Sequence, residues 1–378
     1  MKKRYLLTPG PTMVPPEVLQ ASSRPMIHHR APEYEPLFSR TNEGLQYVFQ
    51  TTNPVVSFAS SGTGAMEAAV VSILSPGDKA ITVEGGKFGE RWTEIAQAYG
   101  ANAIPVQVEW GRAIEAEKIE KLLREHPDVK AVFITHCETS TGVLTDIKNI
   151  GTVVASSDAV LVVDAVSSLG AEMLYGDDWK LDIVVSGSQK ALMMPPGMAF
   201  ASISPKARAL IQSAKCSKYY FSLSKYLKNL EKNTTPFTPA VSLTLALDQA
   251  LELIRKEGLE QIWARHDRLA RAIRSGVHAL GLELFAKDRA NVVTSVKVPE
   301  GIDGAKIPKI LRDDYGITIA GGQAKLKGKI FRIAALGYAD TFDVTTVLSA
   351  LELTLKRLGH PVKLGSGLKA ALEVFETS

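Results

Sequence analysis

Short and nearly continuous apolar runs, separated by helical patterns, are the feature that most limits how this chain can fold. Several of the runs between about residue 40 and residue 235 lack alternating polar residues, which is expected for strands covered on both faces. Strands joined by helices imply right-handed crossovers and a mostly parallel sheet. The predicted strands are residues 55–59, 79–83, 103–108, 131–135, 159–163, 183–185 and 199–203. We therefore expect an α/β fold built on a mostly parallel seven-stranded sheet.

The pattern changes after the last of these strands. Two long helices are predicted at residues 242–256 and 259–280, with Gly258 between them. A smaller α+β region follows, with strands at 292–298, 317–320 and 329–334 and helices at 307–314 and 344–358. Residues 1–16 are rich in Pro and Gly and predict an extended N-terminal arm. We expect three parts: the arm at 1–16, a large domain at 17–265 and a small C-terminal domain at 266–378.

The composition is that of an ordinary globular protein. The 378 residues are 45% hydrophobic and 22% charged, and the net charge of +4 is too small to favour nucleic acid or an anionic membrane as a partner. No apolar stretch approaches the roughly 18 residues of a membrane span, and no signal-peptide core follows Met1. The two cysteines, Cys137 and Cys216, form neither a disulfide framework nor a CxxC metal motif. These features predict a cytoplasmic enzyme.

A turn rich in small residues, SSGTGA at 60–65, follows the first predicted strand and opens a helix. Small residues let a ligand approach the backbone, and the free N–H groups at a helix N-terminus bind phosphate. Gly and Ser also make plain turns, so the segment alone leaves both interpretations open. No GK[ST] follows, and Glu67 stands where a dinucleotide-binding turn would have its third glycine.

Two ionisable residues lie at the ends of neighbouring predicted strands. Asp164 ends the run 159–163, and Lys190 follows the run 183–185 by a few residues. A helix N-cap or a metal ligand would also account for the aspartate, and most lysines are solvated surface groups. Taken with the small-residue turn, however, the pair suggests a Schiff-base amine beside a carboxylate for a pyridine ring. Pyridoxal phosphate (PLP) requires that combination.

Six short motifs, which follow one another in a fixed order along the chain, give it a resemblance to a known family. It resembles the class V aminotransferases of PLP fold type I, in the group that includes the alanine–glyoxylate, serine–glyoxylate and serine–pyruvate enzymes. The motifs are TPGP at 8–11, SGTG at 61–64, ETSTG at 138–142, DAVSS at 164–168, SQKA at 188–191 and RIA at 332–334.

The resemblance implies a role for each matching residue. Lys190 would bind PLP covalently and later carry the proton between the substrate Cα and the cofactor, while Asp164 would hold the pyridine nitrogen. Arg332 would bind the substrate carboxylate through its planar guanidinium, beside Gly10 of the arm. The remaining cofactor contacts would be Thr63, Gly64 and Gln189 to the phosphate, Thr139 near the phenolic oxygen and Phe88 on the ring face.

Two substitutions relative to the family bear on cofactor binding. Relatives often carry Trp where this chain has Phe88, and some carry His where it has Ala65. The segment 233–239 resembles a stretch that reaches the phosphate of a neighbouring subunit, with Thr235 and Thr238 as the candidates. The resemblance therefore implies a homodimer with shared active sites.

The predicted function is transfer of an amino group from alanine or serine to glyoxylate or pyruvate by a ping-pong mechanism. One visible carboxylate clamp, Arg332, disfavours aspartate and glutamate as donors. A cysteine desulfurase or lyase of the same fold is the alternative, with Cys216 in the basic setting KCSK, which is expected to lower its pKa. Cys137 is expected to pack near the cofactor. The paired His28 and His29 lack a third ligand for a metal.

Similar sequences have also been labelled the small subunit of a soluble hydrogenase. Such a non-catalytic electron-transfer partner should carry clustered cysteines for an iron–sulfur centre. Two isolated cysteines do not meet this requirement, so this interpretation ranks last.

Overall fold

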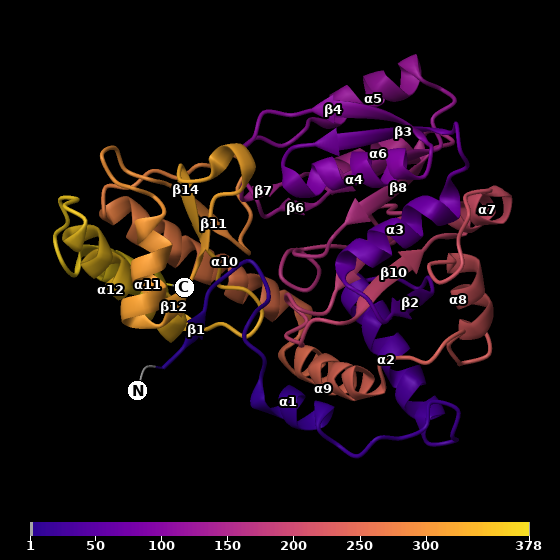
Figure 1. Ribbon diagram of the computed structural model, residues 1–378, viewed down its shortest axis with the longest axis horizontal. Coiled ribbons are helices and arrows are strands. Elements are labelled where there is room, and N and C mark those ends of the chain that lie inside the picture. The colour runs from indigo at the N-terminus through magenta and orange to yellow at the C-terminus, as the bar shows by residue number, and fades with distance from the viewer. Residues whose placement is uncertain (1–2, 378) are drawn as a thin grey trace.

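The computed structural model describes residues 3–377 and contains a seven-stranded sheet within that range, in the order β2-β10-β9-β8-β5-β3-β4 (Figure 1). β10 runs antiparallel to both its neighbours, and the other pairings are parallel. The predicted sheet is therefore confirmed, and each strand lies within two residues of its predicted bounds. The strands are β2 (Val55–Phe58), β3 (Lys79–Glu84), β4 (Asn102–Gln107), β5 (Ala131–Thr135), β8 (Val160–Asp164), β9 (Ile183–Gly187) and β10 (Ala199–Ile203).

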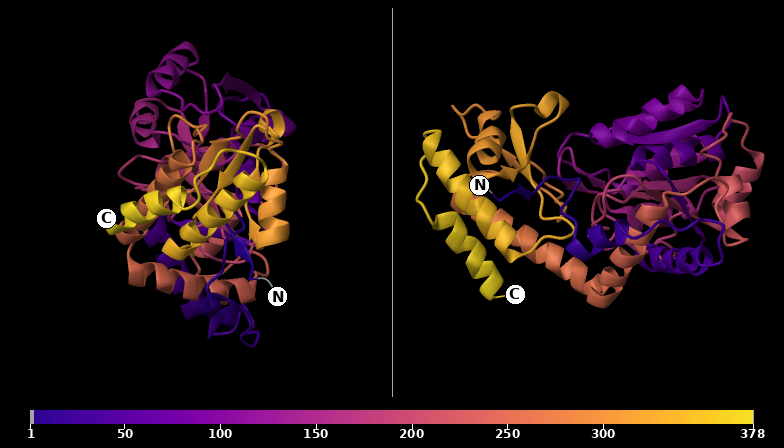
Figure 2. Two further views of the ribbon diagram at one scale, coloured as in Figure 1. Left: turned by 90° about the vertical axis from the view of Figure 1, so that its left-hand side faces the viewer. Right: turned by 60° about the horizontal axis from the view of Figure 1, so that its bottom comes forward.

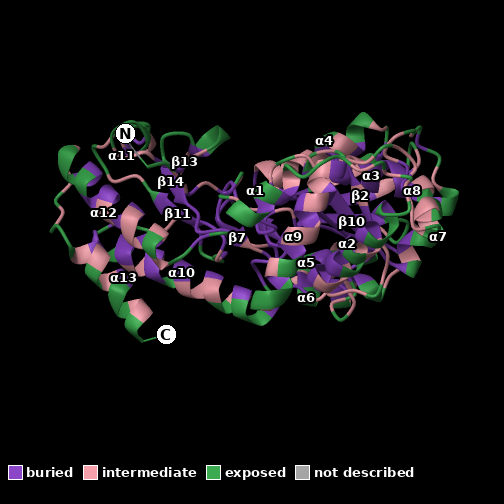
Figure 3. Ribbon diagram, turned by 90° about the horizontal axis from the view of Figure 1, so that it is seen from below, coloured by how far each residue is buried: buried purple, intermediate pink, exposed green. Residues whose placement is uncertain are grey.

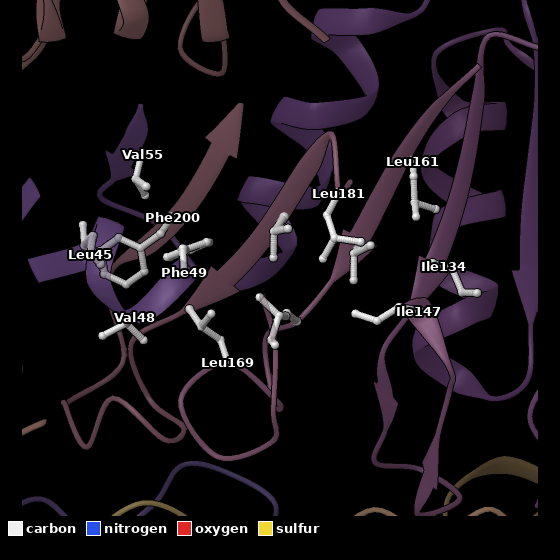
Figure 4. Packing of buried hydrophobic residues seen from close by; sticks show 14 of the residues in the cluster. Leu45, Val48, Phe49, Val55, Ile134, Ile147, Leu161, Leu169, Leu181 and Phe200 are labelled. Carbon is white, nitrogen blue, oxygen red and sulfur yellow. The ribbon is translucent and has the colours of Figure 1, made fainter. Parts of the chain in front are cut away.

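Helices cover both faces of this sheet, which explains the apolar runs. In β8, Leu161 and Val163 belong to one buried cluster, while Val160 and Val162 belong to the cluster on the opposite face. Figure 4 shows Leu161 and Ile134 of the first cluster near Ile147 of a covering helix. The helices of the first face are α2 (Tyr34–Phe49), α5 (Ala116–Glu125), α6 (Ile147–Ala155) and α9 (Val241–Glu257). Those of the second are α3 (Gly62–Ile73), α4 (Lys87–Ala98), α7 (Pro205–Ser213) and α8 (Leu223–Leu230).

The C-terminal part has its own buried cluster and a small sheet, β11-β14-β13, within the described residues. The helix α10 (Leu259–Ala279) runs from the large sheet towards this part (Figure 2). Figure 3 shows buried residues, in purple, both around the large sheet and in the C-terminal part. The elements are β11 (Thr294–Lys297), α11 (Lys306–Tyr315), β12 (Ile317–Thr318), β13 (Ala320–Gly321), the 3₁₀ helix η1 (Ala324–Leu326), β14 (Ile330–Ile333), α12 (Thr341–Arg357) and α13 (Ser366–Glu376). Because α10 is continuous across residue 265, the division into domains at that residue stays a prediction.

The single strand predicted at 317–320 is wrong. The chain changes partner at Ile319: β12 pairs with β1 (Tyr5–Leu6) of the N-terminal arm, whereas β13 pairs with β14. A run of apolar residues does not reveal which neighbour each residue will bond. The arm is extended, as expected, until the short helix α1 (Pro16–Ser22) begins.

The sequence predicts no membrane-spanning segment. Among residues 3–377, no helix combines the length and the apolar character that crossing a bilayer requires.

Candidate active site

Lys190 lies in a tight turn, residues 188–194, directly after β9. The turn is fixed by backbone bonds, since the Met193 N–H donates to the Lys190 carbonyl at 3.0 Å and the Ser188 N–H donates to the Met198 carbonyl at 2.9 Å. Thr12 of the arm adds a third bond, from its hydroxyl to the Lys190 carbonyl, at 2.9 Å. The lysine side chain is buried, with 9% of the residue exposed. Both the sheet and the arm therefore position this amine.

The arm covers the amine of Lys190. The Nζ group donates a short hydrogen bond to the Pro9 carbonyl. Gly10 adopts φ +115°, and a Cβ there would lie 2.5 Å from Cδ and Cε of Lys190 and 2.6 Å from Nζ. Glycine is therefore required at position 10 both by the backbone and by the lysine packed against it. Gly10 therefore lies beside the Lys190 side chain, and its predicted place in the substrate pocket stays a prediction.

Asp164 lies at the same edge of the sheet, because β8 and β9 are parallel neighbours in which Asp164 pairs with Val185. Its Oδ1 accepts the Val166 N–H at 2.8 Å, and residues 166–168 form a turn rather than a helix, so the N-cap alternative is wrong. Burial raises the pKa of Asp164 to about 6, with the positive charges of Arg91 and Lys190 opposing that rise. Burial lowers the pKa of Lys190 to about 8, with the charge of Asp164 opposing the fall. The two groups therefore interact within one buried site.

The beginning of α3 forms a cradle beside this pair. Ser61 at the N-cap makes no side-chain capping bond, so Gly62, Thr63 and Gly64 start the helix without one. Gln189 faces this end, since a Cβ on Gly187 would lie 3.1 Å from Gln189 Oε1 and 3.5 Å from the Gly62 nitrogen. Within the described residues, Gln189 Oε1 is buried without a hydrogen-bond partner.

These features of the cradle fit a phosphate group. A helix N-terminus favours an anion, and the amide of Gln189 presents an NH₂ donor once its nitrogen and oxygen exchange places. The residues present therefore suit the phosphate end of PLP.

Phe88 and Thr139 approach the site from two further segments. Phe88 is in the first turn of α4, and the guanidinium of Arg91, on the next turn, lies 5.0 Å from the centroid of its ring. Arg91 also donates to the Thr63 hydroxyl at 3.2 Å, which links α4 to the cradle. Arg91 is not among the residues predicted from the sequence, although its i,i+3 spacing from Phe88 on a helix was a usable signal. Thr139 is buried in the loop between β6 (Cys137–Glu138) and β7 (Val143–Leu144).

Arg332 reaches the site from β14 in the small sheet. Its Nε and Nη2 donate to the Gly321 carbonyl at 3.0 and 2.7 Å, and its Nη1 donates to the Thr139 carbonyl at 2.7 Å. The arginine is buried, and desolvation lowers its pKa to about 10, against the effect of the Glu138 charge. Its partners are backbone carbonyls, so this cation is oriented without being neutralised by direct pairing with a carboxylate.

The two candidate threonines remain apart from this group of contacts. Thr235 is buried and its hydroxyl donates to the Phe237 carbonyl of the same chain at 2.8 Å, while Thr238 is exposed. No described contact joins either residue to Lys190 or Asp164. Their contact with a neighbouring subunit stays a prediction.

The expectation for Cys216 is wrong. Its thiol is buried with Sγ 3.6 Å from the Tyr99 carbonyl, and desolvation raises its pKa although Lys218 opposes the shift. Cys137 is also buried, and burial raises its pKa well above the usual value. His28 and His29 lie in a loop, and residues 3–377 contain no group of three potential metal ligands.

Comparison with known proteins gives a consistent family. The family model of class V aminotransferases matches residues 4–336. An uncharacterized aminotransferase of Methanocaldococcus jannaschii is 46% identical over 99% of this chain and 98% of its own length. The soluble hydrogenase 42 kDa subunit of Anabaena cylindrica is 42% identical over 99% of both chains. The serine–glyoxylate aminotransferase of Hyphomicrobium methylovorum is 37% identical over 98% of this chain and 94% of its own.

A solved structure is similar over the whole molecule. The ureidoglycine–glyoxylate aminotransferase of Bacillus subtilis superposes with a TM-score of 0.96 and is 34% identical, covering 100% of this chain and 99% of its own.

The raised pKa of Asp164 predicts a stability cost in the PLP-free protein. Because the folded-state pKa of about 6 exceeds the ordinary 3.8, ionisation destabilises the fold increasingly from about pH 4 to pH 6, and the cost then stays constant. At about 1.4 kcal/mol per pKa unit, Asp164→Asn should raise the free energy of unfolding by about 3 kcal/mol at pH 7.5. The gain should disappear near pH 4. Urea unfolding of the PLP-free variants at both pH values measures this difference.

A matched control is Asp182→Asn. The Asp182 carboxylate is buried but accepts the Leu161 N–H at 2.9 Å and the Ser204 hydroxyl at 2.6 Å, so this variant should not be stabilised. Equal stability of Asp164→Asn and the unmodified protein at pH 7.5 would contradict the assigned cost.

Proposed function

Since the chain belongs to the class V aminotransferase family, we propose that it is a PLP-dependent transaminase for small substrates. Alanine or serine donates the amino group, and glyoxylate or pyruvate accepts it, in a ping-pong exchange. The observation that carries this proposal is the buried pair of Lys190 and Asp164 at adjacent strand ends, beside an unfilled hydrogen-bonding group on Gln189. When bound, PLP supplies an aldehyde for the amine and a cationic ring that accepts electrons from the substrate.

Residues of the chain transfer the proton, stabilise the charge on the ring and bind the cofactor. Lys190, whose pKa is lowered to about 8, takes and returns a proton at its Nζ near neutral pH. The carboxylate of Asp164 stabilises a protonated pyridine nitrogen, and a cation there supplies the partner that the buried carboxyl lacks. The first turn of α3 and Gln189 bind the phosphate, Phe88 covers the ring face and Thr139 lies near the phenolic oxygen.

Arg332 supports the choice of substrates with one carboxylate. A guanidinium has five N–H donors. Three of them are used by the Gly321 and Thr139 carbonyls, which leaves two N–H groups on the Nη atoms for a carboxylate. The arm residues Pro9 and Gly10 lie over the Lys190 amine and limit the space beside it, which suits a small amino acid.

The resemblance of the segment 233–239 to a stretch that reaches a neighbouring subunit's phosphate supports a homodimer in which Thr235 or Thr238 makes this contact. A cytoplasmic location and the absence of nucleic-acid partners stay predictions from the composition. A desulfurase mechanism is disfavoured, because the raised pKa and burial of Cys216 do not suit a mobile nucleophile. The name of the Anabaena relative does not favour an electron-transfer role, since the chain has two cysteines and an iron–sulfur cluster usually needs about four.

The direct test is an assay of amino transfer with purified protein and added PLP. Alanine or serine with glyoxylate should give glycine and the matching 2-oxo acid, and Lys190→Ala should abolish turnover. Aspartate and cysteine serve as comparison donors. If the protein binds PLP and transfers no amino group between any of these pairs, the proposed function is wrong.

Arg332→Ala should raise KM for the amino donor by more than about 100-fold while PLP remains bound, since the carboxylate loses two charge-assisted hydrogen bonds of about 1.5–3 kcal/mol each. Arg332→Lys should recover only part of this loss, because an ammonium lacks the planar fork. Steady-state kinetics with absorbance of the bound cofactor measures both effects. Normal KM values in Arg332→Ala would remove the arginine from substrate binding.

The lowered pKa of Lys190 also predicts the pH dependence of PLP uptake. The neutral amine is the nucleophile, so the uptake rate should rise with pH and level off above about pH 8, rather than near the ordinary lysine value of 10.5. Stopped-flow absorbance from pH 6 to pH 10 measures the rate, with a solvated model lysine as the reference in the same buffers. A rate that keeps rising to pH 10, as for the reference, would contradict the assigned shift.

A further inference from the structure

Glu138 is a buried carboxylate that no role described above uses. It ends β6, with 3% of the residue exposed, and both of its oxygens are fully engaged. Oε2 accepts the backbone N–H groups of Phe88 at 3.0 Å and Gly89 at 2.9 Å. Oε1 accepts the Ser140 N–H at 3.1 Å and the Ser140 hydroxyl at 2.5 Å.

These donors come from two segments that are about 50 residues apart in the chain. Phe88 and Gly89 begin α4, whose N-terminus favours a negative charge. Ser140 belongs to the loop that carries Thr139, and its hydroxyl also accepts the Lys87 N–H at 3.1 Å. The segments are in close contact, because a Cβ on Gly86 would lie 2.5 Å from Glu138 Cγ and from Ser140 Oγ.

Each of the two segments carries contacts of the candidate active site. The first turns of α4 present Phe88 and, through Arg91, a hydrogen bond to Thr63 in the cradle. The loop presents Thr139, whose carbonyl holds Nη1 of Arg332. One carboxylate therefore joins the segments that contact the ring face, the phosphate and the substrate clamp.

We propose that Glu138 is a positioning residue that sets the first turn of α4 against the Thr139 loop, so that PLP and the substrate carboxylate bind in register. This inference rests on the proposed function. Glu138 touches neither reactant and acts through Phe88, Thr139 and their neighbours. Its chemistry demands a carboxylate, because all four of its partners are donors and an amide can accept on one side only.

Glu138→Gln tests the proposal, with Glu352→Gln as the matched control. Glu352 is likewise buried and accepts backbone N–H groups, from Gly365 at 2.6 Å, Gly367 at 2.8 Å and Leu368 at 3.1 Å, but it joins α12 to α13 in the small domain. Both variants lose hydrogen bonds of the same kind and should lose similar stability in urea. Only Glu138→Gln should weaken PLP binding, by about 10-fold in Kd, and raise KM for alanine or serine by about 5-fold.

Binding is followed by fluorescence quenching during titration with PLP, and the visible circular dichroism of the saturated protein reports how the ring is held. We expect a smaller dichroic signal per bound PLP in Glu138→Gln and an unchanged signal in Glu352→Gln. Ser140→Ala removes one of the four donors and keeps the carboxylate, so a roughly 3-fold weaker Kd is expected. It provides the decisive measurement should Glu138→Gln fail to fold.

The outcomes separate the two proposals. If the unmodified protein does not bind PLP, the proposed function fails. If it binds PLP and Glu138→Gln, or Ser140→Ala in its place, binds with unchanged Kd and dichroism, the positioning role is wrong. Equal weakening of PLP binding in Glu352→Gln would also overturn it, because the effect would then follow stability alone.

Discussion

The interaction between the buried amine of Lys190 and the buried carboxyl of Asp164 is the constraint on which the site depends. Burial disfavours the charged form of each group, while the charge of each favours the charged form of the other. Neither residue makes a direct ion pair with the other among the described salt bridges, so much of the desolvation cost is uncompensated within the chain. A ligand that supplies an electrophile to the Lys190 amine and a cation to the Asp164 carboxyl relieves the desolvation cost. Buried ionisable groups whose desolvation is not compensated within the chain are typical of functional sites.

The small sheet and the arm complete this site from the opposite side. β14 brings Arg332 to the Thr139 loop, and the Ala334 N–H beyond it donates to the Leu7 carbonyl of the arm at 3.0 Å. Gly337 follows and packs on the lysine turn, since a Cβ there would lie 3.0 Å from the Lys190 carbonyl. The large sheet positions the Lys190 amine, whereas the small sheet and the arm position the residues around that amine.

Side chains of α10 hold this last contact in place. The Gly337 N–H donates to Nε2 of His266 at 3.0 Å, and Nη1 of Arg265 donates to the Gly337 carbonyl at 3.0 Å. Burial lowers the pKa of His266 to about 3, so the ring is neutral and accepts at Nε2 throughout the physiological range. The helix that leads away from the large sheet therefore also fixes the loop that packs against Lys190.

The seven strands, the long helices and the placing of Asp164 and Lys190 at strand ends were predictable from the sequence, because burial on both faces and strand-end chemistry leave local patterns. It did not reveal the partner change at Ile319, the burial of Cys216, the link from Arg91 to Thr63 or the four donors around Glu138. These features became visible in the folded chain alone, because each depends on contacts between segments far apart in the sequence. A local pattern records how a residue is buried and seldom which distant group will meet it.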